Sequence, residues 1–175
     1  LKERLRSGPR LANVEYHDRY LNSPLTVRLL VDLLGHLRQH PGGLDATTSL
    51  RVVTTGLRES WQPRGLQDDW PYENERNEVI KQVFAAASLP LSFESLERRR
   101  TQHARQLTLR WTDGATWTVR LDQGLGFLRP VRDGMPYPFG RPPQEQAQHL
   151  LGRVASVEPR DEIPVVLYTG TLQRA

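Results

Sequence analysis

The stretch "TQHARQLTLRWTDGATWTVRLDQGLGF", residues 101–127, decides the fold that we expect. Apolar and polar residues alternate in two runs, 103–111 and 116–121, which is typical of β-strands with one buried face. Between the runs lies Asp113-Gly114, a strong hairpin signal because glycine reaches the backbone angles of a tight turn. The stretch therefore predicts a β-hairpin.

The first predicted strand carries two polar residues on its apolar side. Alternate residues of a strand share a face, so His103 and Arg105 lie with Leu107, Leu109 and Trp111. An arginine beside an apolar interior is costly unless an anion or a carboxylate pairs with it. Two interpretations stay open. In one, His103 and Arg105 bind phosphate; in the other, they are the polar edge of the hairpin, with Arg105 paired to Asp113 or Glu94.

Outward from the hairpin, helix and strand patterns alternate along the chain. Ser23-Pro24 is a helix start, with serine as N-cap and proline in the first turn, followed by a leucine stripe at helical spacing. Further helices are expected at 73–89 and 144–155, and further strands at 12–16, 49–55, 89–96 and 163–168. This order predicts an α/β layered domain with a mixed β-sheet flanked by helices.

Composition limits the class of protein. The 175 residues suffice for one domain with a sizeable core, and we expect 1–175 to be that domain or a module of a larger protein. The chain has no cysteine, which excludes disulfides and zinc–thiolate sites. No apolar run is long enough to span a membrane, and a cytoplasmic location is expected.

The positive charge of the chain comes almost wholly from arginine. The formal net charge is +4, and of the 24 basic residues all but Lys2 and Lys81 are arginines. The planar guanidinium binds phosphate through two parallel hydrogen bonds, so an anionic partner such as nucleic acid or a lipid headgroup is plausible. A GC-rich genome would produce the same excess without any function, and this explanation has about even weight.

Several motifs resemble the phospholipase D superfamily. "HARQLTLRWTDG" followed by "GLGF" is similar to its His-x-Lys strand, Asp-Gly turn and Gly-rich turn, and "VEYHDRYLNSP" is similar to its opening strand and loop. The order of motifs, over about 13–130, is closest to the phospholipase D-like domain at the C-terminus of MIT-domain proteins. The resemblance implies one half of a phospholipase D-like fold, with its core in that range.

The chain departs from the catalytic pattern of that superfamily. Arg105 replaces the lysine, Asp113 lies further from His103 than the pattern requires, and "GLGF" lacks the serine and asparagine of the catalytic turn. The superfamily uses two such motifs, one histidine attacking phosphorus and the other protonating the leaving group. One chain supplies at most one motif, so catalysis would need a homodimer.

Three functional hypotheses follow. The first is a catalytically degenerate phospholipase D-like module that binds anionic phosphate, most of all nucleic acid, within a larger bacterial assembly, such as one of genome defence. The second is an active homodimeric phosphodiesterase or nuclease that uses His103. The third is a docking module for protein or acidic lipid, with lipid the weaker of these partners because no amphipathic insertion segment is evident. Enzymatic activity is thus undecided and leans towards absent.

The candidate residues for phosphate binding fall in three places. They are His103 and Arg105, the strand-to-helix loop residues Arg19 and Tyr20, and the basic turn Arg98, Arg99 and Arg100. Loops that follow strands carry ligands in open α/β sheets, which is why Arg19 and Tyr20 are included. The other partners expected are protein subunits or domains. No cofactor is expected, and no histidine grouping suggests a metal site.

Overall fold

The computed structural model describes residues 1–57, 69–100, 105–121, 128–130, 137–153, 157–159 and 170–173. The elements in these ranges are α1 (Lys2–Ser7), β1 (Leu11–His17), α2 (Pro24–Arg38), β2 (Ser49–Thr55), α3 (Glu73–Ala86), β3 (Ser92–Leu96), the 3-10 helix η1 (Arg98–Arg100), β4 (Arg105–Trp111), β5 (Thr116–Leu121), β6 (Leu128–Pro130), α4 (Pro143–Arg153), β7 (Val157–Pro159) and β8 (Gly170–Gln173).

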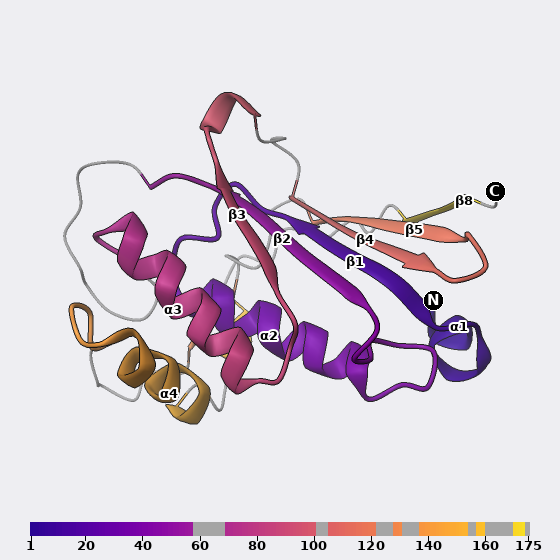
Figure 1. Ribbon diagram of the computed structural model, residues 1–175, viewed down its shortest axis with the longest axis horizontal. Helices are drawn as coiled ribbons and strands as arrows, with labels where there is room; N and C mark the ends of the chain where they lie inside the picture. The colour runs from indigo at the N-terminus through magenta and orange to yellow at the C-terminus, as the bar shows by residue number, and fades with distance from the viewer. Residues whose placement is uncertain are drawn as a thin grey trace.

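The main sheet is mixed, as the sequence predicts. Its six strands have the order β3-β2-β1-β4-β5-β8, with β1, β2 and β3 parallel and with β4, β5 and β8 pairing in antiparallel fashion. The ribbon shows this sheet with α2, α3 and α4 beside it (Figure 1). The predicted α/β layered architecture is therefore confirmed.

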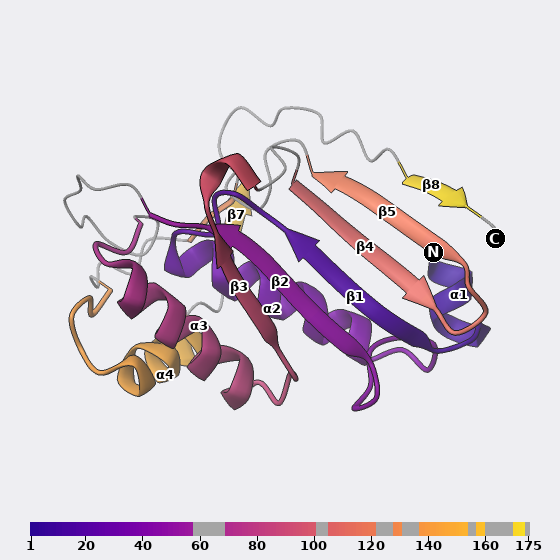
Figure 2. The ribbon, with the colours of Figure 1, turned by 45° about the horizontal axis from the view of Figure 1, so that its top comes forward.

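In the described part of the chain, the helices cover one face of the sheet, and no helix covers the other face. With the top of the molecule turned forward, α2 passes behind β1 and β2, and α3 lies beside β3 (Figure 2). Strand residues alternate accordingly: Val14 and Tyr16 of β1 are buried towards α2, whereas Glu15 and His17 are only half-buried on the other side. We call this second side the outer face.

The predicted hairpin forms between β4 and β5. Gly114 has φ +83°, a conformation that side chains strongly disfavour, and its N–H donates to the Trp111 carbonyl across 3.0 Å. In β4, Leu107, Leu109 and Trp111 are buried on the face towards the helices, and Arg105 lies on the same face by alternation. The inward orientation predicted for Arg105 is thus confirmed.

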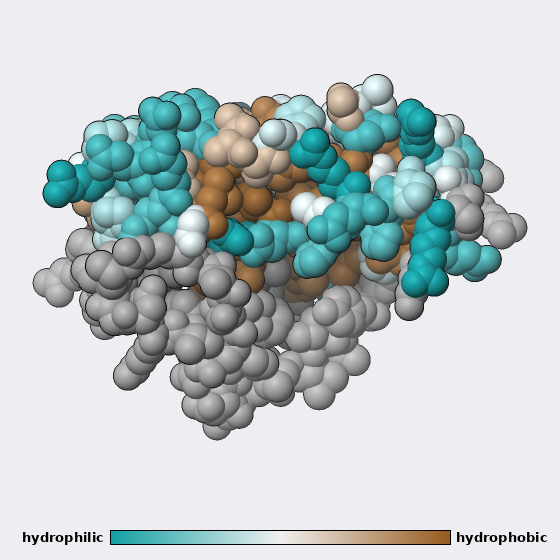
Figure 3. All heavy atoms as spheres, turned by 90° about the horizontal axis from the view of Figure 1, so that it is seen from below, coloured by the Kyte–Doolittle hydropathy of each residue, from teal (hydrophilic) through white to brown (hydrophobic). Residues whose placement is uncertain are grey.

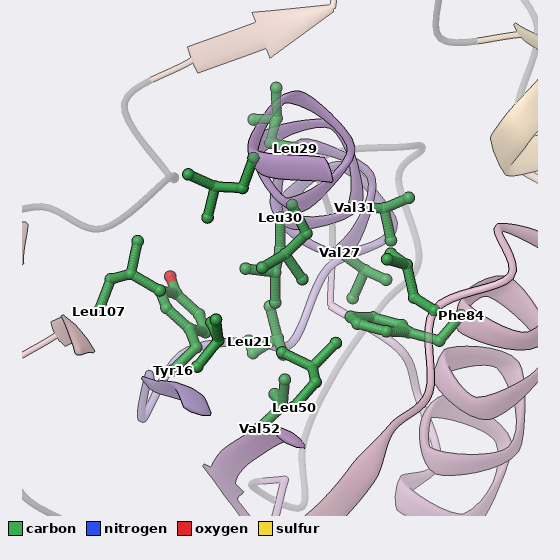
Figure 4. Packing of buried hydrophobic residues seen from close by; sticks show 14 of the residues in the cluster. Tyr16, Leu21, Val27, Leu29, Leu30, Val31, Leu50, Val52, Phe84 and Leu107 are labelled. Carbon is green, nitrogen blue, oxygen red and sulfur yellow. The ribbon is translucent and has the colours of Figure 1, made fainter. Parts of the chain in front are cut away.

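The helix α2 is the centre of the core. It begins as predicted, with the Ser23 hydroxyl accepting from the Thr26 N–H and Pro24 in the first turn. Figure 4 shows its side chains between Tyr16 and Leu107 on one side and Phe84 of α3 on the other. Most of its residues are buried on a broad apolar face, whereas Arg28, Asp32 and His36 lie on the opposite, polar face.

Some strands of the structure were not predicted, and some predictions concern residues that the structure does not describe. The short strands β6, β7 and β8 were not predicted, because three or four residues show no measurable alternation. The strand expected at 163–168 and the residue His103 lie outside the described ranges.

Candidate functional site

The strand directions bring the predicted basic residues to one edge of the sheet. The parallel strands β1, β2 and β3 end at the edge where the antiparallel strand β4 begins. Arg19 and Tyr20 follow β1, η1 follows β3, and Arg105 opens β4. We call this set, Arg19, Tyr20, Arg98, Arg99, Arg100 and Arg105, the arginine edge. In Figure 2, η1 and the start of β4 lie at the same end of the sheet.

Arg105 is held by two groups from the loop after β1. Its Nε donates to Asp18 Oδ1 across 3.3 Å, and its guanidinium carbon lies 4.6 Å from the centre of the Tyr20 ring, a cation–π contact. The Arg105 side chain is 21% exposed, whereas that of Asp18 is 2% exposed. The cation therefore stands at the boundary between core and solvent, facing a buried carboxylate.

Asp18 is a buried acceptor for three donors. Besides Arg105, the Tyr16 hydroxyl donates to Oδ2 across 2.9 Å, and the Tyr20 N–H donates to Oδ1 across 2.8 Å. Burial raises the pKa of Asp18, an effect that the Tyr20 N–H and Arg105 partly oppose. Burial, together with the charge and hydrogen bond of Asp18, also raises the pKa of Tyr16. This network fixes the loop that carries Arg19 and Tyr20.

The two partners considered for Arg105 in the sequence are bound elsewhere. Asp113 in the hairpin turn pairs with Arg4 of α1 at 3.0 Å. Glu94 pairs with Arg51 at 2.8 Å on the outer face. The prediction that Arg105 pairs with Asp113 or Glu94 is therefore wrong in its partner. Asp18 was missed because its place beside Arg105 depends on the pairing of β1 with β4, which sequence patterns do not show.

Arg76 of α3 connects several segments at the end of the sheet where the arginine edge lies. Its side chain is fully buried and donates to the Thr55 carbonyl at 2.7 Å, to Asn22 Oδ1 at 3.1 Å and to Ser95 Oγ at 3.1 Å. Burial lowers the pKa of Arg76 to about 10, so it stays charged at neutral pH. Sequence patterns missed this residue because helical periodicity registers apolar positions only.

Arg99 and Arg100 are the exposed part of the arginine edge. Arg99 has a side chain that is 78% exposed and pairs with Glu97 at 2.7 Å. The Arg100 N–H donates to the Glu97 carbonyl across 2.8 Å, which closes the η1 turn, and its side chain is exposed. Exposed ion pairs contribute little free energy and exchange readily for another anion, so both guanidiniums are accessible to phosphate oxygens.

A groove lies on the opposite part of the molecule, between α2 and the C-terminal end of α3. Two adjoining hollows of about 520 and 420 Å³ share Arg38 and Leu89 in their lining. Seen from below, the molecule shows an apolar strip framed by hydrophilic side chains (Figure 3). Gly35 of α2 borders the groove, and no atom lies within 4 Å of where its Cβ would be.

Metal ligands and membrane-spanning helices can be judged on the described residues. No group of three or more histidine, aspartate or glutamate side chains is placed there to hold a metal ion. None of the helices in the same ranges has the length and apolar character needed to cross a membrane.

Comparison with known protein families places the chain. Residues 1–170 match the family model described as the C-terminal domain of the DEAD/DEAH box helicase YjiV. No curated protein and no solved structure gave a match. Because the match covers nearly the whole chain, the chain belongs to this family of helicase C-terminal domains.

The family match corrects the resemblance drawn from the motifs. The chain belongs to the helicase family and not to the phospholipase D superfamily or the domain of MIT-domain proteins, so that identification is wrong. The predicted phospholipase D-like half-fold, His-x-Lys-like motif and nuclease chemistry rested on it. The mixed α/β sheet remains, because it was inferred independently from the order of helix and strand patterns.

Proposed function

We propose that this domain is a non-catalytic module of a DEAD/DEAH box helicase, and that its arginine edge holds the phosphate backbone of the nucleic acid on which the helicase acts. The observation that supports the proposal best is the convergence of basic residues from three separate segments, after β1, after β3 and at the start of β4. Family membership supports it in a second way, since a helicase is an enzyme of nucleic acids.

In this proposal, some residues at the arginine edge hold its structure in place and others contact the nucleic acid. Asp18 and Tyr20 hold Arg105, so the loop after β1 and the start of β4 form one rigid support. Arg99 and Arg100, which are exposed, make the first contacts with phosphate oxygens. Arginine keeps its charge at every physiological pH, which suits a binding surface. The contacts are to the backbone, so they position the nucleic acid without reading its sequence.

This proposal retains part of the sequence hypotheses. Phosphate binding by Arg19, Tyr20, Arg98, Arg99, Arg100 and Arg105 continues as a proposal, and that of His103 remains a prediction outside the described ranges. The single domain expected over 1–175 is, in this proposal, one module of the larger helicase. Its other partners are then parts of the same enzyme.

The proposal is tested with the double variant Arg99→Gln/Arg100→Gln. Each neutralised phosphate releases counterions, so the slope of log affinity against log salt reports how many cations contact a single strand, at about 0.7 per contact. We expect the double variant to reduce this slope by about 1.4 for a fluorescent single-stranded 20-mer between roughly 50 and 200 mM salt. Fluorescence anisotropy provides the affinities.

Lys81→Gln is the matched control, because Lys81 is an exposed cation of α3 away from the arginine edge. Its slope should equal that of the wild type. A wild-type chain that does not bind, or whose affinity is independent of salt, would refute the proposed function.

A further inference from the structure

The outer face of the sheet differs between its two halves. In the half formed by β1, β2 and β3, the carboxylates Glu15 and Glu94 are both bound by Arg51, at 2.8 Å each, and Glu15 also pairs with His17. The hydrogen bond from Arg51 lowers the pKa of Glu94. Burial opposes the ionised form of Glu15, but His17, Arg51 and, from β4, Arg110 together lower its pKa. The charges of this half therefore largely compensate one another, and the field of Arg110 reaches Glu15 as well.

The half formed by β4 and β5 carries only cations among its charged residues. Arg110 of β4 and Arg120 of β5 point away from the helices and are exposed. The other positions on this face are hydroxyl and amide side chains, in the cross-strand rows Gln106–Arg120, Thr108–Thr118 and Arg110–Thr116. Gln106, Thr116 and Thr118 are half-buried and Thr108 is buried, so the two arginines are the exposed groups of this face. Arginine, threonine and glutamine side chains are among the groups that contact phosphates and sugars in nucleic-acid complexes.

The register links this surface to the arginine edge. Arg120 lies opposite Gln106, the neighbour of Arg105, so it stands at the end of the sheet where β4 begins. Arg110 lies four residues after Gln106 in β4. At 3.3–3.4 Å per residue, this places it about 13 Å from Gln106 along the strand. Gln106 in turn lies opposite His17, beside the loop that carries Arg19 and Tyr20. A line of cations thus runs from the edge onto the outer face.

We infer that the outer face of β4 and β5 is a second nucleic-acid contact, which takes a single strand and not a duplex. The inference rests on the proposed function, because the strand would leave the arginine edge and continue across Arg120 and Arg110. A path that turns from the edge of a sheet onto its face requires a flexible chain, whereas duplex DNA is stiff over about 150 base pairs. No helix covers this face in the described part of the chain (Figure 2).

The test measures binding of a single-stranded 20-mer and of a 20-base-pair duplex by Arg110→Gln, Arg120→Gln and the double variant. We expect each single variant to lower the salt slope for the single strand by about 0.7, and the double variant by about twice that amount. For the duplex the variants should behave as wild type. Lys81→Gln again controls for net charge, and thermal unfolding confirms that the variants, altered at exposed positions, are folded.

The outcomes separate this inference from the proposed function. If Arg99→Gln/Arg100→Gln lowers the slope but the outer-face variants do not, the second contact is excluded and the proposed function stands. If the outer-face variants weaken duplex binding as much as single-strand binding, the assignment to single strands is wrong. If the wild type binds neither probe, both proposals fail.

Discussion

Asp18 and Arg105 form the contact on which the geometry of the arginine edge depends. Asp18 is almost fully buried, and Arg105 is its only cationic partner among the described residues. A buried carboxylate that loses its cation is an uncompensated charge in a medium that solvates it poorly. The pair therefore fixes the loop after β1 against the start of β4.

We predict that Arg105→Met destabilises the free protein, although methionine nearly preserves the volume of the side chain. The free energy of unfolding should fall by about 3–5 kcal/mol, the usual cost of removing one partner of a buried ion pair. Urea denaturation monitored by circular dichroism measures it. The double variant Asp18→Asn/Arg105→Met should recover part of the loss, because it removes the stranded charge. Unchanged stability of Arg105→Met would show that Asp18 does not depend on Arg105.

The alternation of β4 was sufficient to predict that Arg105 points inward, but not which carboxylate meets it. Asp113 was considered because it lies in the turn of the same hairpin, and Glu94 because its strand precedes β4 along the chain. The partner is set by the order of strands, which places β1 beside β4 and so brings Asp18 to Arg105. Strand order is a property of tertiary packing that single-sequence patterns do not encode.

At the scale of elements, Arg76 joins α3 to the ends of two strands and to the loop before α2. It donates to Asn77 of the same helix and to three acceptors from other segments of the chain, Thr55, Asn22 and Ser95. Close by, Trp70 donates to Gln146 of α4 at 3.1 Å, and Gln146 donates to Glu75 of α3 at 2.7 Å. Polar side chains thus dock α3 and α4 where apolar packing alone would not fix their positions.

We predict that Arg76→Met lowers the free energy of unfolding by about 1–3 kcal/mol, since it leaves the buried carbonyl of Thr55 without its donor. Chemical denaturation measures the loss. Arg76→Lys should recover only part of it, because an ammonium group lacks the fork that reaches three acceptors at once. Lys81→Met, at an exposed position of the same helix, should stay within about 0.5 kcal/mol of wild type. Equal stability of Arg76→Met and wild type would contradict the docking role.

The elements with strong local signals were predictable. The Ser23-Pro24 start of α2 and the Asp113-Gly114 turn depend on interactions within a few residues, and the structure confirms both. The strands β6, β7 and β8 are stabilised by pairing with distant segments, so their sequences carry little signal of their own.

At the scale of the whole molecule, the sheet separates surfaces with different character. The arginine edge and the outer face carry accessible guanidiniums, whereas the groove beside α2 is lined by apolar and charged residues together, such as Leu44, Leu89 and Asp45. Fold class followed correctly from the order of helix and strand patterns, but family did not. The stretch "HARQLTLRWTDG" reflects a strand and a hairpin turn, and its order with the other motifs resembled a superfamily to which the chain does not belong.

The most direct measurement of the central claim is a nuclear magnetic resonance titration of the isotope-labelled chain with a single-stranded oligonucleotide. We predict that backbone amide shifts concentrate at Arg19 and Tyr20, at Arg98–Arg100 and at Arg105, and diminish as salt is added, because the contacts are ionic. Shifts confined to the groove residues of α2 and α3, or no shifts at low salt, would contradict the claim that the arginine edge contacts nucleic acid.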